Sequence, residues 1–464
     1  MTAALALLCL AGPAWPVAAQ PGNRPPGVPP PVDLTALPTP ASVNTLPYLV
    51  STPAAQQTGP PTRQAPCQQP VTSGAQDLVT EPTAQRRLRI RKAQEYATGR
   101  GQRVAVIDSG VQPHPRLLGR LIDGGDYIEN RSGLFDCDGH GTAVAGLIAA
   151  APDARTGFVG VAPAAEILAI RQGSTFYSVP LRQLTTGQQT SSSAGDTRSM
   201  AAAVMRAVQL GATVINISEA ACFPAEPNQV NAPDLQAAVH YAVEHNVVVV
   251  VAAANVSNIC KQNSPGVVTT ISSPGWFDAD VLTVAATYDD GQPADFSIRG
   301  PWVDVAAPGT GAVSLAPGRA GLTAGLLDAR SQAYPLSGTS FAAPYVAGLA
   351  ALVRDRFTNL SARQVIHRIE QTARHPAGRR ERNEDVGYGM IDPVAALTAV
   401  LPEERSPQAQ PVLPSKRDGL RSTPRPNSTL ALAGSAAALG ALGLALMVVQ
   451  TVKRQRRCPH QPRH

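Results

Sequence analysis

Short apolar runs alternate with helix-like stretches over residues 85–400, and this alternation restricts the fold more than any other feature of the sequence. The runs predicted to be strands are 103–107, 166–170, 213–217, 247–252 and 281–285. The stretches predicted to be helices are 142–150, 197–210, 234–245, 339–357 and 362–372. Apolar strands separated by helices indicate an α/β fold, in which a parallel sheet is covered by helices on both faces.

Residues 173–195 fit neither pattern. The segment is rich in Ser, Thr and Gln, and it is longer than the usual connection between a strand and a helix. We therefore expect an exposed insertion there.

Proline marks the two ends of the alternating region. Prolines are concentrated in 21–82 and 402–426, which together hold 21 of the 43 in this chain of 464 residues. The roughly 315 residues between these segments are enough for one large hydrophobic core. We predict a Pro-rich N-terminal extension at 20–84, one globular domain at 85–400 and a Pro-rich linker at 401–428.

Two apolar segments near the ends predict export and a membrane anchor. Residues 1–19 are apolar and end in V-A-A, as in a secretory signal peptide, although no Lys or Arg precedes the apolar stretch. Residues 430–449 carry no charge over about the length that crosses a bilayer as a helix. We expect a transmembrane helix at 429–452 and a cytoplasmic tail at 453–464. Residues 20–428 would then lie outside the cytoplasm, as in a single-pass type I protein.

The net charge of +6 does not indicate nucleic-acid binding. Lys and Arg are scattered, and the basic runs at 86–92 and 453–457 contain no aromatic residues on which bases could stack. We therefore expect no nucleic acid among the partners.

In this topology four cysteines lie in an oxidising compartment: Cys67, Cys137, Cys222 and Cys260. An even number of thiols there favours two disulfides, for which three pairings are possible. A metal site at Cys137 and His140 is the alternative, but no second pair of ligands lies nearby at zinc spacing. We therefore expect no metal site.

Polar residues follow the predicted strands at the edge where parallel sheets collect ligands and catalytic groups. Asp108 directly follows V-A-V-I, and Asn255 comes three residues after a run of valines. His140 in G-H-G-T and Ser340 in G-T-S-F-A-A-P are flanked by small residues and lead into helices. Each residue alone would also suit a turn or a helix cap, but the four together indicate one site.

The segments V-A-V-I-D-S-G-V, D-G-H-G-T-A-V-A-G and S-G-T-S-F-A-A-P resemble the subtilisin-like serine proteases, which carry Asp, His and Ser in this chain order. The resemblance covers about residues 90–400 and implies the subtilisin-like parallel sheet. It implies Ser340 as the nucleophile, His140 as the general base, Asp108 as the residue that orients the imidazole, and Asn255 as a donor to the oxyanion. A lipase-like acyl hydrolase would instead need G-x-S-x-G around its serine.

The same resemblance implies two segments that flank the substrate: Ser218, Glu219 and Ala220 on one side, and Ala252, Ala253 and Ala254 on the other. Two features depart from the family. Ala254 stands where subtilisins usually have Gly, and the sequence N-I-S-E-A-A-C replaces a Gly-rich segment. Because these side chains enter the region where the substrate backbone docks, we expect slow turnover and a narrow substrate range.

Within the family, the Pro-rich extension with one Cys, the sequence V-I-N-I-S-x-x-x-C-F-P and the span after a Pro-rich linker look like the mycosins, which are membrane-anchored proteases of type VII secretion systems in actinobacteria. In mycosins the extension wraps over the catalytic domain, one disulfide ties it near the His motif, and a second follows the N-I-S strand. The resemblance therefore implies that Cys67 pairs with Cys137 and Cys222 with Cys260.

The mycosin resemblance also implies a function and partners. It implies limited proteolysis of proteins exported by type VII secretion, and stabilisation of the secretion complex independently of cleavage. The membrane components of that complex and the membrane itself would be further partners. The alternatives are a structural component with dispensable catalysis and a general degradative protease. No cofactor is implied, and loop carboxylates for structural calcium are not identifiable in the sequence.

Overall fold

The structure is a computed structural model that describes residues 24–44, 55–71, 79–186, 188–228, 231–327, 332–375 and 382–405. The predicted signal peptide at 1–19, nearly all of the predicted linker, and the predicted span and tail at 429–464 lie outside these ranges. In the part of the chain that is described, no helix has the length and apolar character needed to cross a membrane.

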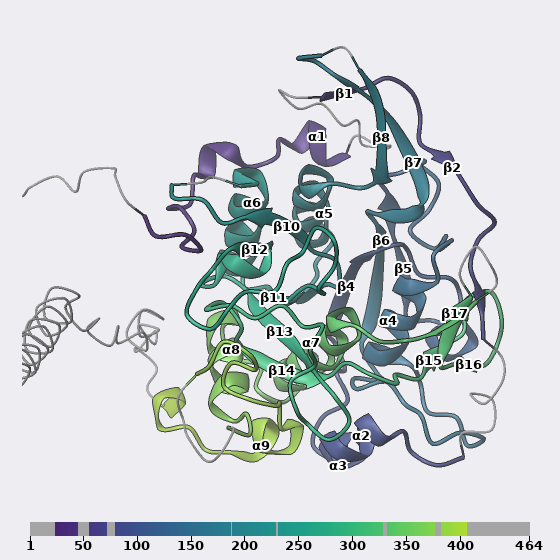
Figure 1. Cartoon of the computed structure of the whole chain (residues 1–464). Coiled ribbons are helices and arrows are strands. Elements are labelled where there is room, and N and C mark those ends of the chain that lie inside the picture. Colours follow the sequence, from purple (N-terminus) through teal and green to yellow (C-terminus); the bar gives the residue numbers. More distant parts are fainter. Residues whose placement is uncertain are drawn as a thin grey trace, which may run out of the picture. The chain divides into compact units, whose positions relative to one another are not determined.

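Seven parallel strands form the central sheet (Figure 1). The next two strands of this sheet after β4 in the chain, β5 and β6, lie on one side of β4, and the later strands lie on its other side. Every neighbouring pair is parallel. Apart from the edge strand β5, the strands are almost wholly buried because helices cover both faces, which explains their apolar sequences. In sheet order they are β14 (Val305–Pro308), β13 (Leu282–Thr287), β11 (Val248–Ala252), β9 (Val214–Ile217), β4 (Arg103–Asp108), β6 (Glu166–Arg171) and β5 (Leu121–Asp126).

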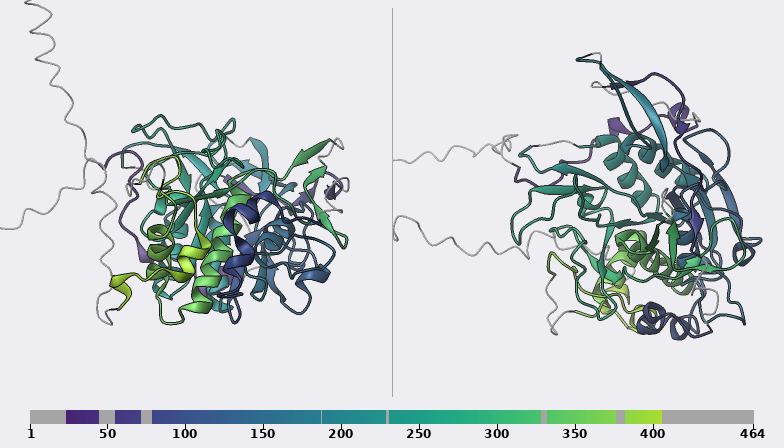
Figure 2. Two further views of the ribbon diagram at one scale, coloured as in Figure 1. Left: turned by 90° about the horizontal axis from the view of Figure 1, so that it is seen from below. Right: turned by 45° about the vertical axis from the view of Figure 1, so that its right-hand side comes forward.

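Two pairs of helices cover the sheet (Figures 1 and 2). On one face α4 (His140–Ala149) packs against α7 (Thr339–Arg356), and on the other α5 (Thr197–Gln209) packs against α6 (Pro233–Glu244). The helices α8 (Ala362–Gln371) and α9 (Pro393–Thr398) pack against α7. The shorter elements outside the extension are α2 (Thr83–Leu88), α3 (Ile90–Ala93), η2 (Pro115–Leu117), β10 (Ala221–Pro224), β12 (Thr270–Ser273), η3 (Gly275–Phe277), β15 (Ser314–Leu315), β16 (Leu322–Thr323), β17 (Gly325–Leu327), β18 (Ala333–Pro335) and η5 (Pro402–Arg405).

The structure confirms the five predicted strands and the five predicted helices, each within two residues at either end. The strands β5 and β14 were not predicted. The sequence of β5, L-I-D-G-G-D, has too many Asp and Gly residues to be typical of a strand, and β14 is only the short run V-A-A-P. Pairing with β6 therefore holds β5 in the sheet, and pairing with β13 holds β14, although their own sequences have little preference for a strand.

The Pro-rich extension runs along the domain in short pieces. Its segments η1 (Leu34–Ala36) and α1 (Pro40–Asn44) pack against α6 and α5. The hydroxyl of Tyr127 donates to the carbonyl of Val43 over 2.8 Å, and Gln236 Nε2 donates to that of Pro30 over 2.7 Å. Further along, β1 (Ala55–Gln57) and β2 (Thr62–Arg63) pair with β7, and β3 (Gln69–Pro70) pairs with β17. The described part of the extension is therefore held by contacts with the domain.

The segment 173–195 forms a β-hairpin, here called the arm. Its strands are β7 (Ser174–Gln183) and β8 (Gln189–Ala194), which pair antiparallel. Figure 1 shows the arm projecting from the sheet with β1 and β2 beside it. Most of β8 is exposed, as expected of an insertion. The strands were not predicted, because β8 is polar and β7 contains a proline. Besides β8, β7 pairs with β1 and β2, more than a hundred positions earlier in the chain.

Candidate active site

Four polar residues lie at the carboxyl end of the central sheet. Asp108 is the last residue of β4, and Asn255 follows β11 by three residues. His140 begins α4, and Ser340 is the second residue of α7. Because these strands are parallel and the two helices pack against each other, all four predicted residues are brought to one edge of the sheet.

His140 and Asp108 form a hydrogen-bonded pair. His140 Nδ1 lies 2.7 Å from Asp108 Oδ1, and the Asp108 side chain is completely buried. Gly141 makes this approach possible, because a Cβ atom at position 141 would lie 2.1 Å from the carbonyl oxygen of Gly110 and 3.0 Å from Asp108 Oδ1. The pair is therefore set by close backbone packing of α4 against the end of β4.

The pKa of His140 is raised by its surroundings. Burial alone would lower the pKa, but the charge and hydrogen bond of Asp108, with smaller contributions from Glu219 and Asp136, raise it to about 9. The imidazolium is thus strongly stabilised at this position. Such stabilisation is what a base needs when it takes a proton during a reaction.

Ser340 lies at the start of α7, close to the imidazole. The ring centroids of His140 and Phe341, the residue after Ser340, are 5.1 Å apart. Within the described part of the chain Ser340 Oγ makes no hydrogen bond. The serine hydroxyl and the His140 imidazole are therefore not hydrogen-bonded to each other in this structure. Catalytic hydrogen bonds are often long in the absence of substrate and tighten when substrate binds.

Asn255 is held in one orientation beside Ser340. Its Oδ1 accepts hydrogen bonds from the backbone N–H of Thr339, over 2.9 Å, and from the Thr339 hydroxyl, over 3.1 Å. Since the oxygen is used in this way, the NH₂ group remains available as a donor. A Cβ at Gly338 would lie 3.0 Å from Ser340 Oγ and 3.1 Å from Asn255 Nδ2, so the position of Gly338 brings both groups close together and has no room for a side chain.

Ala254 keeps a backbone conformation that favours glycine. Its φ is +78°, and the residue is buried. An L-residue in this region costs roughly 1–2 kcal/mol. The departure from the family noted above therefore changes the side chain at position 254 without changing the left-handed backbone there.

The residues expected to flank the substrate fall into two groups. Glu219 and Ala220, which follow β9, are partly exposed and can be reached from solvent. The other four, Ser218, Ala252, Ala253 and Ala254, are buried. Ser218 has a defined internal role, because its hydroxyl accepts from Asn216 Nδ2 and donates to the carbonyl of Ser340.

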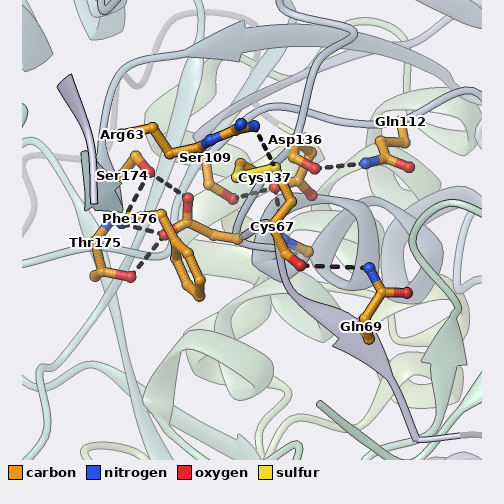
Figure 3. The surroundings of a disulfide bond; sticks show 12 residues. Arg63, Cys67, Gln69, Ser109, Gln112, Asp136, Cys137, Ser174, Thr175 and Phe176 are labelled. Atoms are coloured by element: carbon orange, nitrogen blue, oxygen red, sulfur yellow. Dashed lines mark hydrogen bonds between the residues drawn. A yellow bond between two sulfur atoms is a disulfide. The ribbon is translucent and has the colours of Figure 1, made fainter. Parts of the chain in front are cut away.

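Two disulfides are present, Cys67–Cys137 and Cys222–Cys260. The first joins the extension to the loop just before His140, and the backbone N–H of Gln68 also donates to the carbonyl of Cys137 over 2.8 Å. Figure 3 shows this bond, with Phe176 near the start of β7 packed beside it. The extension is thus fixed within three residues of the imidazole.

Two buried carboxylates that were not predicted shape the same loop. Asp136 accepts hydrogen bonds from Ser109 Oγ over 2.9 Å, as Figure 3 shows, and from the backbone N–H of Gly139 over 2.7 Å. Asp138 accepts from the backbone N–H and hydroxyl of Thr175, each over 2.7 Å, and so ties the loop to the arm. The sequence signal was present in F-D-C-D-G-H-G, where an Asp flanks Cys137 on each side.

Known proteins share this arrangement. The family model described as Subtilase family (Peptidase_S8) matches residues 99–389. Mycosin-1 of Mycolicibacterium smegmatis is 43% identical over 371 residues, which cover 76% of this chain and 81% of that protein. The chain belongs to the subtilase family and, within it, to the mycosins. It is a subtilisin-like serine endopeptidase.

Two solved structures extend the comparison. One is the MycP3 protease from the type VII (ESX-3) secretion system, with 40% identity and a TM-score of 0.69, covering 80% of this chain and all of that one. The other is a chain in the intact ESX-5 inner membrane complex, with 36% identity and a TM-score of 0.69, covering 92% of this chain and 99% of that one. Mycosins thus share their fold with this chain across most of its length.

Proposed function

We propose that Ser340, His140 and Asp108 form the catalytic triad of this endopeptidase. Ser340 Oγ attacks the scissile carbonyl while His140 accepts its proton and later passes it to the leaving amine. Asp108 holds the imidazole by its Nδ1 and stabilises the imidazolium. The observation that carries this proposal is the 2.7 Å contact between His140 Nδ1 and Asp108 Oδ1 at the start of the helix that packs on α7.

The oxyanion of the tetrahedral intermediate would receive two hydrogen bonds. Asn255 Nδ2 supplies one, because Thr339 fixes the opposite end of the amide. The backbone N–H of Ser340, in the first turn of α7, supplies the other. Both donors are set before substrate arrives, and such preorganisation is the largest source of stabilisation in many hydrolases.

The substrates we propose are proteins exported by a type VII secretion system, which the chain cleaves at a small number of sites. The support is its membership of the mycosins, together with the relatives solved from type VII systems. The altered segments at Glu219 and Ala254 favour limited rather than general proteolysis. The hypothesis of a general degradative protease is less favoured, because the same altered segments would restrict its substrates.

We also propose that the chain is anchored in the cell membrane by residues 429–452, with its catalytic domain outside the cytoplasm. The support is the uncharged apolar run at 430–449 and the apolar residues 1–19. The two disulfides suit an oxidising compartment. A reporter that is active only in the cytoplasm should be inactive when fused near residue 400; an active fusion would reverse the topology.

A second function is favoured by one observation. A chain in the intact ESX-5 inner membrane complex covers 92% of this chain and 99% of its own length. We therefore propose that the protein also stabilises a secretion complex, independently of cleavage.

Comparing proteins secreted by the wild type, a Ser340→Ala strain and a deletion strain tests both functions. We expect cleaved fragments only from the wild type, full-length export from Ser340→Ala, and little export from the deletion strain. Identical fragments from wild type and Ser340→Ala would refute the catalytic assignment. Normal export from the deletion strain would refute the stabilising function.

A further inference from the structure

Four carboxylates lie in and around the loop that carries His140: Asp108, Asp136, Asp138 and Glu219. Asp108 accepts from His140 and from the backbone N–H of Ser109 through its Oδ1. Asp136 and Asp138 accept from the loop and the arm as described above. Each of these three carboxylates therefore has hydrogen-bond donors that the fold itself provides.

Glu219 is the exception. In the described residues its carboxylate has neither a hydrogen bond nor an ion pair. Burial, followed by the charge of Asp108, raises the pKa of Glu219 to about 8, and only His140 acts to lower it. An acidic side chain in partly dehydrated surroundings is costly without a partner, so this carboxylate needs an explanation.

The backbone around Glu219 leaves room for its side chain. A Cβ atom at position 173 would lie 2.6 Å from Glu219 Oε2, so Gly173 is the residue that allows the carboxylate to lie against the start of the arm. The backbone N–H of Gly173 lies 3.5 Å from the carbonyl of Asp108. The carboxylate is therefore placed between the arm and the catalytic edge of the sheet while remaining partly exposed.

A resident metal ion does not account for these acids. Over the described ranges no group of three or more His, Cys, Asp and Glu side chains is arranged to hold one. Without substrate, the raised pKa keeps much of Glu219 protonated near neutral pH, and His140 favours its ionised form. A cation that arrives with the substrate would add a direct partner and favour the ionised carboxylate further.

We propose that Glu219 is a specificity-determining residue whose carboxylate binds the side chain of a Lys or Arg close to the scissile bond of the substrate. The inference rests on the proposed function of Ser340 as nucleophile and adds the substrate class. A cationic side chain would form charge-assisted hydrogen bonds with Glu219 and offset the negative charge of the surrounding carboxylates.

The position of Glu219 limits where that cation sits. Glu219 follows Ser218, whose hydroxyl is 2.9 Å from the carbonyl oxygen of Ser340. Its carboxylate is thus on the order of 10–15 Å from the nucleophile, given about 3.8 Å between neighbouring Cα atoms. An extended substrate rises about 3.3 Å per residue, so the cation belongs within about four residues of the scissile bond.

Quenched fluorescent peptides test this inference on the full-length protein in detergent. Each of the four positions on either side of the scissile bond carries Lys, Gln or Glu in turn, and kcat/KM is measured for each peptide. At one or two adjacent positions we expect the wild type to prefer Lys over Gln by about tenfold or more, the effect of one charged hydrogen bond. Glu should be the poorest residue there.

The variant Glu219→Gln keeps the size of the side chain and removes its charge, so the ratio of Lys to Gln peptides should fall to within about twofold. The matched control is Glu226→Gln, an exposed acidic residue shortly after β10, which should keep the wild-type ratio. An unchanged ratio in Glu219→Gln, or no preference for Lys in the wild type, would overturn the inference.

Peptidyl phosphonates with Lys or Gln at the preferred position separate this inference from the proposed function, because they react with the serine without turnover. Faster inactivation by the Lys compound, lost in Glu219→Gln, would support the role of Glu219. Equal inactivation by both compounds overturns that role alone. A wild type that cleaves no peptide and reacts with no phosphonate contradicts the proposed function and this inference together.

Discussion

The hydroxyl of Ser218 donates a hydrogen bond to the backbone carbonyl of Ser340, with 2.9 Å between the two oxygens. In a regular helix this carbonyl would accept from the residue four positions later. That residue is Pro344, which has no N–H to donate. Ser218 thus supplies the hydrogen bond that the helix lacks at Ser340, the proposed nucleophile.

Ser218→Ala should therefore destabilise the fold at the nucleophile. It leaves a buried carbonyl without a donor, which costs about 1–3 kcal/mol. Thermal unfolding of the detergent-extracted protein should show a lowered midpoint, while Ser191→Ala in the exposed strand β8 should behave like wild type. Equal unfolding midpoints for Ser218→Ala and wild type would show that the bond contributes nothing.

Asn255→Ala should reduce turnover without abolishing folding. In subtilisin, a member of the same family, removing the equivalent donor lowers kcat by roughly 10²–10³. We expect a loss of that order, with KM little changed, since the amide acts on the oxyanion rather than on bound substrate. Asn258→Ala, in the same exposed loop, is the control. A similar loss in both variants would point to loop damage instead.

The raised pKa of His140 predicts the pH dependence. Only the neutral imidazole accepts a proton, so kcat/KM should rise between pH 7 and about pH 9. The stability effect has the opposite direction: the contribution of the protonated ring is complete below the ordinary pKa of 6.5 and is lost as pH rises through about 9.

Removing a negative charge near His140 should shift the pH range over which kcat/KM rises. Glu219→Gln takes away one of the charges that stabilise the imidazolium, so the kcat/KM of this variant should rise at lower pH than that of the wild type. Glu226→Gln serves as the control. A profile that is flat from pH 7 to 9 in the wild type would contradict the assignment of His140 as the base.

The Cys67–Cys137 bond should keep the extension on the active enzyme. Non-reducing peptide mapping of membrane-extracted protein should recover a peptide linked through these two residues, even if the chain between them is cut. A disulfide that closes a loop of this length stabilises a protein by roughly 2–4 kcal/mol, so Cys67→Ser should unfold at a lower temperature. Free thiols at both positions would refute the bond.

Much of the fold follows from local sequence patterns. Uninterrupted apolar runs such as V-V-V-V-V-A identified the buried strands, because a strand covered on both faces has few polar positions. The strand β5 was missed since Gly124 and Gly125 give no strand signal. The arm was missed because β8 is polar and β7 contains a proline, neither of which is typical of a strand.

The site follows from sequence only in part. The motifs around Asp108, His140 and Ser340 identify the proposed reacting groups. The roles of the residues that position them cannot be deduced from the motifs: Thr339 orients Asn255, and Ser218 replaces a helical donor, only once β9, β11 and α7 are assembled. The lack of a partner for Glu219 is likewise visible only when every neighbouring donor has been placed.

The most direct test of the account is covalent labelling of the full-length protein with a fluorophosphonate, followed by mass spectrometry of the labelled peptide. We predict a single label on Ser340, no label in Ser340→Ala, and greatly reduced labelling in His140→Ala because the hydroxyl is no longer activated. A label on another residue, or labelling that survives unchanged in either variant, would contradict the proposal that Ser340 and His140 perform the chemistry.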